Sequence, residues 1–215
     1  LGVDLIQGYY TAKPAQEVIM AISDEIKDEI VRYQQQKISN KDSLVYVAGK
    51  ESRVSLAKLV ADQYASIEIV NDKTTYRDVT ISGVPGLITQ IALDIRDGYQ
   101  GRIVLDNVNF SGKKRRTCID IGENCEVTLV LQGENQLCDG GIRVPASSKL
   151  IIEGDGNLDV SVNYDGYFGI GNDVNDGHGI IEFAQDGCVE ISGSGSCGVG
   201  IGSGLGGEIL IHRGK

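Results

Sequence analysis

In the stretch K-L-I-I-E-G-D-G-N-L-D-V, residues 149–160, a short apolar run is followed by a turn rich in glycine and aspartate. Short runs of Ile, Leu and Val, each closed by Gly, Asn or Asp, recur through the rest of the chain. Such runs are typical of short strands joined by turns. Both helical patterns in the sequence lie before residue 65, so we predict a mainly β region over residues 65–215.

Pairs of apolar residues, with one residue between the two members, recur in this region in two series. In the first series, successive pairs lie 23 to 31 residues apart. A unit of this size holds too few apolar side chains to form a domain, but stacked units bury a continuous apolar column. The first series is Leu93/Ile95, Ile119/Ile121, Ile142/Val144, Phe168/Ile170 and Val199/Ile201. The second is Ile103/Leu105, Val127/Leu129/Leu131, Leu150/Ile152, Ile181/Phe183 and Ile209/Ile211.

Two parallel strands per repeat, stacked on their neighbours about 4.8 Å apart, make a β-helix. We therefore predict a right-handed, single-stranded parallel β-helix of about five coils, preceded by amphipathic helices. The alternative is a sandwich of antiparallel hairpins, which would show tight Asn-Gly or Asp-Gly turns between equal strands.

Composition limits the function. The net charge of −10 over 215 residues argues against a nucleic-acid or anionic-membrane partner. No apolar run approaches the ~18 residues of a membrane span. The five cysteines form no C-x-x-C pair, which favours a reducing cytoplasm and packing roles for the thiols. The chain does not begin with Met, and we expect it to be part of a longer protein that could be attached to a membrane upstream.

Two helices are predicted before the β region. Pro14 suits a first helical turn, and an apolar stripe that includes Ile22, Ile26 and Ile30 marks a helix over Ala15–Gln36. Ser52 is a good N-cap for a second helix over Ser52–Tyr64, expected to cap the first coil through Leu56, Leu59 and Val60. A short strand is predicted between the two helices, at Leu44–Ala48.

The stretch G-V-D-L-I-Q-G-Y-Y-T-A-K-P, residues 2–14, resembles the end of an EAL domain, the bacterial phosphodiesterase of cyclic di-GMP. The resemblance covers residues 1–36 and implies the last strand and helix of a (β/α)8-type barrel. It places Gln7 at the catalytic end of that strand. We thus divide the chain into a remnant of an EAL barrel (1–36), a linker strand and capping helix (37–64), and the β-helix (65–215).

Catalysis does not follow from this resemblance. Two-metal hydrolysis needs several carboxylates, and neither the E-A-L signature nor the family's paired Asp motif occurs in this chain. We expect no catalytic residue here, with Gln7 only a remnant. The Mg²⁺ or Mn²⁺ implied by the resemblance would belong to an EAL domain upstream.

A second resemblance covers roughly residues 75–215. The segments L-V-L-Q-G-E-N-Q-L (129–137), residues 149–160, G-I-G-N (169–172) and G-V-G-I-G-S-G (198–204) resemble β-helical domains labelled carbohydrate-binding in gut and cellulolytic bacteria. This resemblance implies contact with a polysaccharide or oligosaccharide.

Candidate ligand-binding residues lie between the apolar pairs, where side chains face outward. They form an expected column of Asp94, Asp120, Arg143, Gly169 and Gly200. The two aspartates could form a carboxylate pair of the glycosidase kind or a solvated ladder. The glycines could admit a flat ligand or ease packing between coils.

Aromatic and metal-binding candidates are few. Tyr99, Tyr164 and Tyr167 are the plausible exposed rings of the β-helix, and they could stack on a sugar. The segment Asp173–Gly177 resembles half a calcium loop, but Ala184 stands where the loop's final Glu belongs, so a turn and no metal is expected.

Two functions of different classes remain open. One is a non-catalytic binding or sensory module, glycan- or partner-binding, carried behind the phosphodiesterase. The other is a structural module that fixes the assembly of the parent enzyme, for instance as a homodimer. A pectin-cleaving type of β-helix is a distant third.

Overall fold

The computed structural model describes residues 44–48, 53–71, 78–112, 117–164, 167–193 and 198–213. The chain divides into two units, Leu1–Asp42 and Ser43–Lys215, and the described residues all belong to the second. Gln7 and the helix predicted over Ala15–Gln36 lie outside the described residues.

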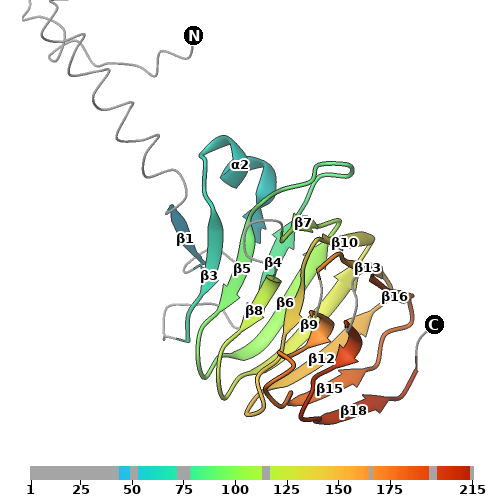
Figure 1. Ribbon diagram of the computed structural model, residues 1–215. Coiled ribbons are helices and arrows are strands. Elements are labelled where there is room, and N and C mark those ends of the chain that lie inside the picture. Colours follow the sequence, from blue (N-terminus) through green and yellow to red (C-terminus); the bar gives the residue numbers. More distant parts are fainter. Residues whose placement is uncertain are drawn as a thin grey trace, which may run out of the picture. The chain divides into compact units, whose positions relative to one another are not determined.

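Three parallel sheets form the walls of a solenoid (Figure 1). Sheet A holds β1 (Val45–Ala48), β3 (Ser66–Ile69), β5 (Ala92–Ile95), β8 (Thr117–Ile121), β11 (Gly141–Arg143), β14 (Phe168–Gly171) and β17 (Val199–Gly202). Sheet B holds β2 (Arg53–Ser55), β4 (Asp78–Ser82), β6 (Gln100–Asp106), β9 (Glu126–Gln132), β12 (Lys149–Gly154), β15 (Ile180–Phe183) and β18 (Glu208–Ile211). Sheet C holds β7 (Asn109–Ser111), β10 (Glu134–Cys138), β13 (Asn157–Val162) and β16 (Val189–Gly193).

From β5 onward the chain passes through sheets A, B and C in turn and then returns to sheet A one rung further on, whereas the first two turns have described strands in sheets A and B only. Neighbouring strands are parallel, for example β5 with β8 and β9 with β12, which confirms the parallel solenoid and excludes the hairpin sandwich. There are about six turns rather than five, because β1 and β2 already form a rung before residue 65. Right-handedness stays a prediction.

The core is a set of stacked apolar columns. In sheet A the column runs in register through Ile67, Leu93, Ile119, Ile142 and Ile170. Each of these side chains is at most 1% exposed. Alternation along each strand turns one side chain in every two toward this core and leaves its neighbours for the outer face.

Buried polar side chains hold the corners between sheets. Asn135, 3% exposed, lies at the corner between sheets B and C. Its Oδ1 accepts the backbone N–H of Val108 at 2.9 Å, and its Nδ2 donates to the carbonyls of Gln132 and Asn157 at 3.1 and 3.2 Å. One side chain thus satisfies backbone groups of three successive turns.

The predicted helix over Ser52–Tyr64 is shorter than expected. The helix α2 spans Leu56–Ala61 with Ser55 as N-cap, while Arg53–Ser55 is strand β2. The strand forms because Val54 turns inward, 1% exposed, and pairs in register with Ile81. The expected cap is confirmed only in part, since Leu56 and Leu59 join the core but Val60 is 41% exposed.

The short strand predicted at Leu44–Ala48 is confirmed as β1. Within the described part of the chain no helix has the length and apolar character needed to cross a membrane.

Candidate ligand-binding site

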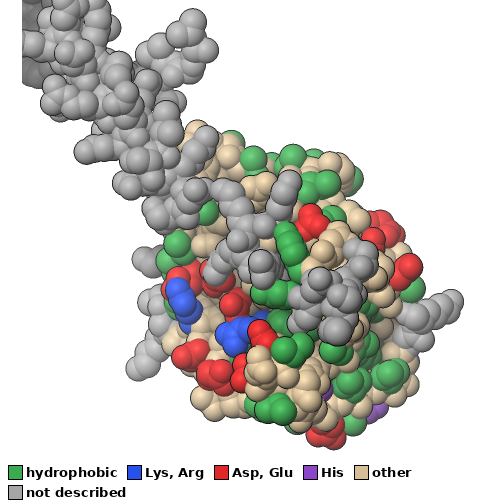
Figure 2. All heavy atoms as spheres, in the orientation of Figure 1, with side chains coloured by type: hydrophobic (Ala, Val, Ile, Leu, Met, Phe, Trp, Pro, Cys, Tyr) green, Lys and Arg blue, Asp and Glu red, His purple; other side chains and the backbone are tan. Residues whose placement is uncertain are grey.

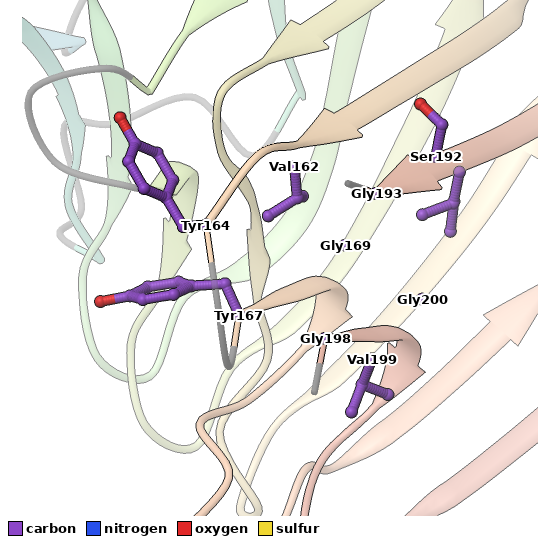
Figure 3. A pocket seen from close by; sticks show the side chains of 10 residues that line it. Val162, Tyr164, Tyr167, Gly169, Ser192, Gly193, Gly198, Val199 and Gly200 are labelled. Carbon is purple, nitrogen blue, oxygen red and sulfur yellow. The ribbon is translucent and has the colours of Figure 1, made fainter. Parts of the chain in front are cut away.

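A small cavity lies where sheet C turns into sheet A in the last turns of the solenoid (Figure 3). Tyr164 follows β13 and Tyr167 precedes β14, so both rings come from one corner of the chain. The cavity measures about 200 Å³. Its lining is Val162, Tyr164, Tyr167, Gly169, Ile191, Ser192, Gly193, Gly198, Val199 and Gly200. We call this site the tyrosine cavity.

The two tyrosine rings form one side of the tyrosine cavity. Their centroids lie 6.0 Å apart with the planes at 63°, an edge-to-face arrangement. The ring of Tyr167 also lies 6.4 Å from that of Phe168, nearly parallel to it at 27°. Because Phe168 is 5% exposed and Tyr167 packs against the core, the solenoid itself holds the Tyr167 ring in place.

The opposite side of the tyrosine cavity is built from strand ends. Figure 3 shows Ser192 across the hollow from the tyrosines, with Gly169 and Gly200 between them. The lining side chains that the structure describes are uncharged, and their polar groups are the two phenols, the Ser192 hydroxyl and backbone amides. Such a lining suits a neutral ligand with hydroxyl groups and an apolar face.

Glycines of sheet A at this corner differ in what surrounds them. A methyl group on Gly141 would overlap the carbonyl oxygens of Phe168 and Gly169 in the next turn. One on Gly169 would overlap the Ile191 side chain. One on Gly200 would meet no atom within 4 Å. Gly141 and Gly169 therefore serve close packing between turns, whereas Gly200 leaves open space in the cavity.

This contrast predicts a difference in stability between two alanine variants. Gly141→Ala forces the backbone of two turns apart and should lower the free energy of unfolding by about 1–3 kcal/mol. Gly200→Ala fills open space and should leave the melting temperature unchanged. Thermal denaturation followed by circular dichroism measures both. Equal melting temperatures for the two variants would contradict the packing role of Gly141.

The expected column of Asp94, Asp120, Arg143, Gly169 and Gly200 is correct for its first three members and wrong for the glycines. Asp120 pairs in register with Asp94 on one side and Arg143 on the other. Arg143 then pairs with Gly171, which pairs with Gly202. Ile142 pairs with Ile170 rather than with Phe168, and this pairing shifts the register by two residues. Gly169 and Gly200 thus lie in the tyrosine cavity, apart from the charged residues.

The charged column on the outer face of sheet A is a network of ion pairs. Glu68, Asp94 and Asp120 stand in register on three successive rungs. Arg96 donates to Glu68 at 2.8 Å, and Arg143 Nε lies 2.6 Å from Asp120 Oδ1. In the view of Figure 2, acidic and basic side chains gather together on one face of the solenoid. The hydrogen bond from Arg96 lowers the pKa of the Glu68 carboxyl below its ordinary value.

This network is better explained as structure than as a catalytic centre. Like charges in register repel one another, and Arg96 and Arg143 offset that repulsion. Asp120 and Arg143 are each about one-third exposed, at 32% and 33%, so the ion pair contributes at most about 1 kcal/mol. None of these residues lines the tyrosine cavity. Asp94 and Asp120 therefore belong to a row of solvent-exposed carboxylates whose charge is balanced by neighbouring arginines.

Tyr99, expected to be an exposed ring, is 2% exposed and belongs to the core. Burial raises the pKa of its phenol well above the ordinary value. Of the three candidate rings, only Tyr164 and Tyr167 reach the cavity. The sequence did not indicate Ser192 and Ile191 as lining residues, because their place in the cavity depends on how β16 meets β17.

Three of the described cysteines, Cys118, Cys125 and Cys138, have the raised pKa of packing residues. Cys118 is 1% exposed, and burial raises the pKa of its thiol to about 12. Burial also raises the pKa of Cys125 and of Cys138. A thiol with a raised pKa is a poor nucleophile at neutral pH. Among the described residues, no group of three or more His, Cys, Asp or Glu side chains is placed to hold a metal ion.

Comparison of the chain with known protein families, with curated proteins and with solved structures gave no match.

Proposed function

We propose that this chain is a non-catalytic binding module that holds one residue of a neutral saccharide in the tyrosine cavity. The observation that carries the proposal is that two tyrosine rings line the same cavity as Gly200, around which there is open space. A sugar ring has apolar C–H faces and a rim of hydroxyl groups. Tyrosine presents a flat apolar ring with a polar end, which matches both features.

The dimensions of the tyrosine cavity favour a single sugar residue. Its volume of about 200 Å³ is below the ~300–1,000 Å³ typical of sites that enclose a drug-sized ligand. The open space at Gly200 lets the rest of an oligosaccharide leave the site toward solvent. The described part of the lining is uncharged, which favours a neutral ligand over uronates and phosphates, because burying an unpaired charge costs free energy.

We also propose that the module follows a cyclic di-GMP phosphodiesterase of the EAL type in a longer cytoplasmic protein. The support for this placement is the Q-G-Y-containing stretch at residues 2–14. The divalent metal and its chemistry would belong to the upstream domain. Binding of a saccharide to the β-helix could then regulate the activity of that enzyme.

The test is a screen for saccharide binding followed by calorimetry. A glycan array probed with the chain should identify neutral oligosaccharides. Isothermal titration with the strongest of them should then give a dissociation constant that rises at least tenfold in Tyr164→Ala and in Tyr167→Ala, a loss of about 1.4 kcal/mol each.

Asp120→Asn serves as the matched control, because it changes the outer face of sheet A without touching the tyrosine cavity. It should bind the saccharide as the wild-type chain does. A ligand whose affinity falls with Asp120→Asn but not with the tyrosine variants would move binding to the charged face. If the chain binds no saccharide on the array, the proposal is wrong.

A further inference from the structure

The inner face of sheet C lacks a side chain at the tyrosine cavity. In β13 the residues Leu158, Val160 and Val162 turn into the core, and each is at most 5% exposed. Strand β16 continues these three columns in the next turn, with the register pairs Leu158/Val189, Val160/Ile191 and Val162/Gly193. The column that contains Val162 therefore has a glycine where the other two columns have an aliphatic side chain.

Gly193 leaves room for a methyl group at this point of the column. Among the described atoms, a methyl group built on Gly193 would meet only the carbonyl oxygen of Val162, at 3.4 Å. That separation is an ordinary van der Waals distance. Gly193 is not one of the glycines with a positive φ, so its backbone would accept a side chain without strain. The sequence therefore leaves a place for one small group in the wall of the cavity.

The described surroundings of this space are largely hydrocarbon. Val162 and Ile191 reach it from sheet C, and the Cγ2 methyl of Ile191 lies against the Gly169 backbone. Val199 lines the same cavity from sheet A, where it pairs in register with the buried Phe168. Figure 3 shows the phenolic oxygens of Tyr164 and Tyr167 pointing away from Gly193. The tyrosines thus present ring carbons, rather than hydroxyl groups, to this part of the cavity.

We propose that the saccharide bound in the tyrosine cavity carries a methyl group, and that this methyl group occupies the space at Gly193. The inference rests on the proposed function, because it specifies which neutral sugars the tyrosine cavity takes. A methyl group placed beside Val162 and Ile191 leaves water for an apolar surrounding, which is favourable.

A hydroxyl group would fit this space less well. A hydroxyl offers one donor and two acceptor sites. The only described atom within 4 Å of the position is the Val162 carbonyl oxygen, which can accept one hydrogen bond but donate none. The acceptor sites of the hydroxyl would lose their hydrogen bonds to water without replacement, which costs free energy. The space therefore discriminates between sugars that differ at a single substituent.

Two kinds of neutral sugar present a methyl group beside a rim of hydroxyl groups. In a 6-deoxyhexose the methyl group replaces the terminal hydroxymethyl group. In an N-acetylated amino sugar it ends the acetamido group. Both carry the chemistry that the space at Gly193 selects, and matched sugar pairs distinguish them.

NMR titration of the isotope-labelled chain with two pairs of monosaccharides tests the preference. N-acetylglucosamine and N-formylglucosamine differ by one methylene, and 6-deoxygalactose and galactose differ by one hydroxyl group. The methyl-bearing member of at least one pair should bind about fourfold more tightly, as expected for burying one such group. The pair that shows the preference identifies the kind of sugar.

Gly193→Ala fills the space with the protein's own methyl group. The variant should lose the preference within the pair and should melt at or above the wild-type temperature, since alanine fits this backbone. Gly177→Ala is the matched control. A methyl group on Gly177 also has a backbone oxygen at 3.4 Å as its nearest described atom, but Gly177 does not line the tyrosine cavity. Gly177→Ala should keep the wild-type preference.

The outcomes separate this inference from the proposed function. Equal affinity within both pairs overturns the inference, and so does a Gly193→Ala chain that keeps the preference or melts well below the wild type. If a saccharide binds through Tyr164 and Tyr167 regardless of its methyl group, the inference is wrong and the proposed function stands. A chain that binds no saccharide contradicts both.

Discussion

Replacing Ile121 with Asp is expected to unfold the solenoid. The Ile121 side chain is 0% exposed and stacks in register on Ile95. A carboxylate at this position has no partner in the apolar column, and burying it should cost several kcal/mol. That is a large fraction of the ~5–15 kcal/mol that stabilises a typical domain.

Ile88→Asp is the matched control, because it makes the same chemical change on a side chain that is 59% exposed. Soluble yield and thermal melting distinguish the two variants. Ile88→Asp should melt as the wild-type chain does, whereas Ile121→Asp should be insoluble or show no cooperative transition. A soluble Ile121→Asp protein that melts near the wild-type temperature would show that this column is not the core.

Replacing Asn135 with Leu is expected to cause the next largest loss. The substitution keeps the size of the side chain but removes its three hydrogen bonds to backbone groups of neighbouring turns. Leaving a buried polar group without a partner costs about 1–3 kcal/mol. The Gln132 carbonyl keeps the hydrogen bond from the Asn107 N–H, so the loss comes from the Val108 N–H and the Asn157 carbonyl and should be about 2 kcal/mol or more.

Chemical denaturation of Asn135→Leu, beside Gln132→Leu, measures this loss. The Gln132 side chain is exposed, so its replacement should change the midpoint little. If both variants unfold at the wild-type denaturant concentration, the Asn135 bonds do not hold the corner.

The repeat and the parallel fold could be predicted from the sequence because apolar alternation fixes which side of each strand faces the core. Alternation has a period of two, so it cannot detect a register shift of two residues. Ile142/Val144 and Phe168/Ile170 look equivalent as pairs, yet the structure pairs Ile142 with Ile170. This shift moved the glycines out of the predicted charged column.

Local pattern also failed where tertiary packing decides the outcome. The segment before Leu56 satisfies helix signals, but pairing with β4 makes it a strand. Tyr99 follows a Gly in a turn and looks exposed in sequence, but its ring is buried in the core. Tyr164 and Tyr167 were correct candidates, although nothing local indicates that β16 and β17 would close a cavity beside them.

The central claim is that the tyrosine cavity binds saccharide, and a variant that fills this cavity tests the claim most directly. Gly200 has open space around the position of a side chain, so Gly200→Val should fold as stably as the wild-type chain. Because Gly200 lines the tyrosine cavity, the added side chain is expected to take up space that the saccharide needs. Calorimetric titration with the saccharide identified by the array should show binding lost, with an unchanged melting temperature. Wild-type affinity in Gly200→Val would contradict the account.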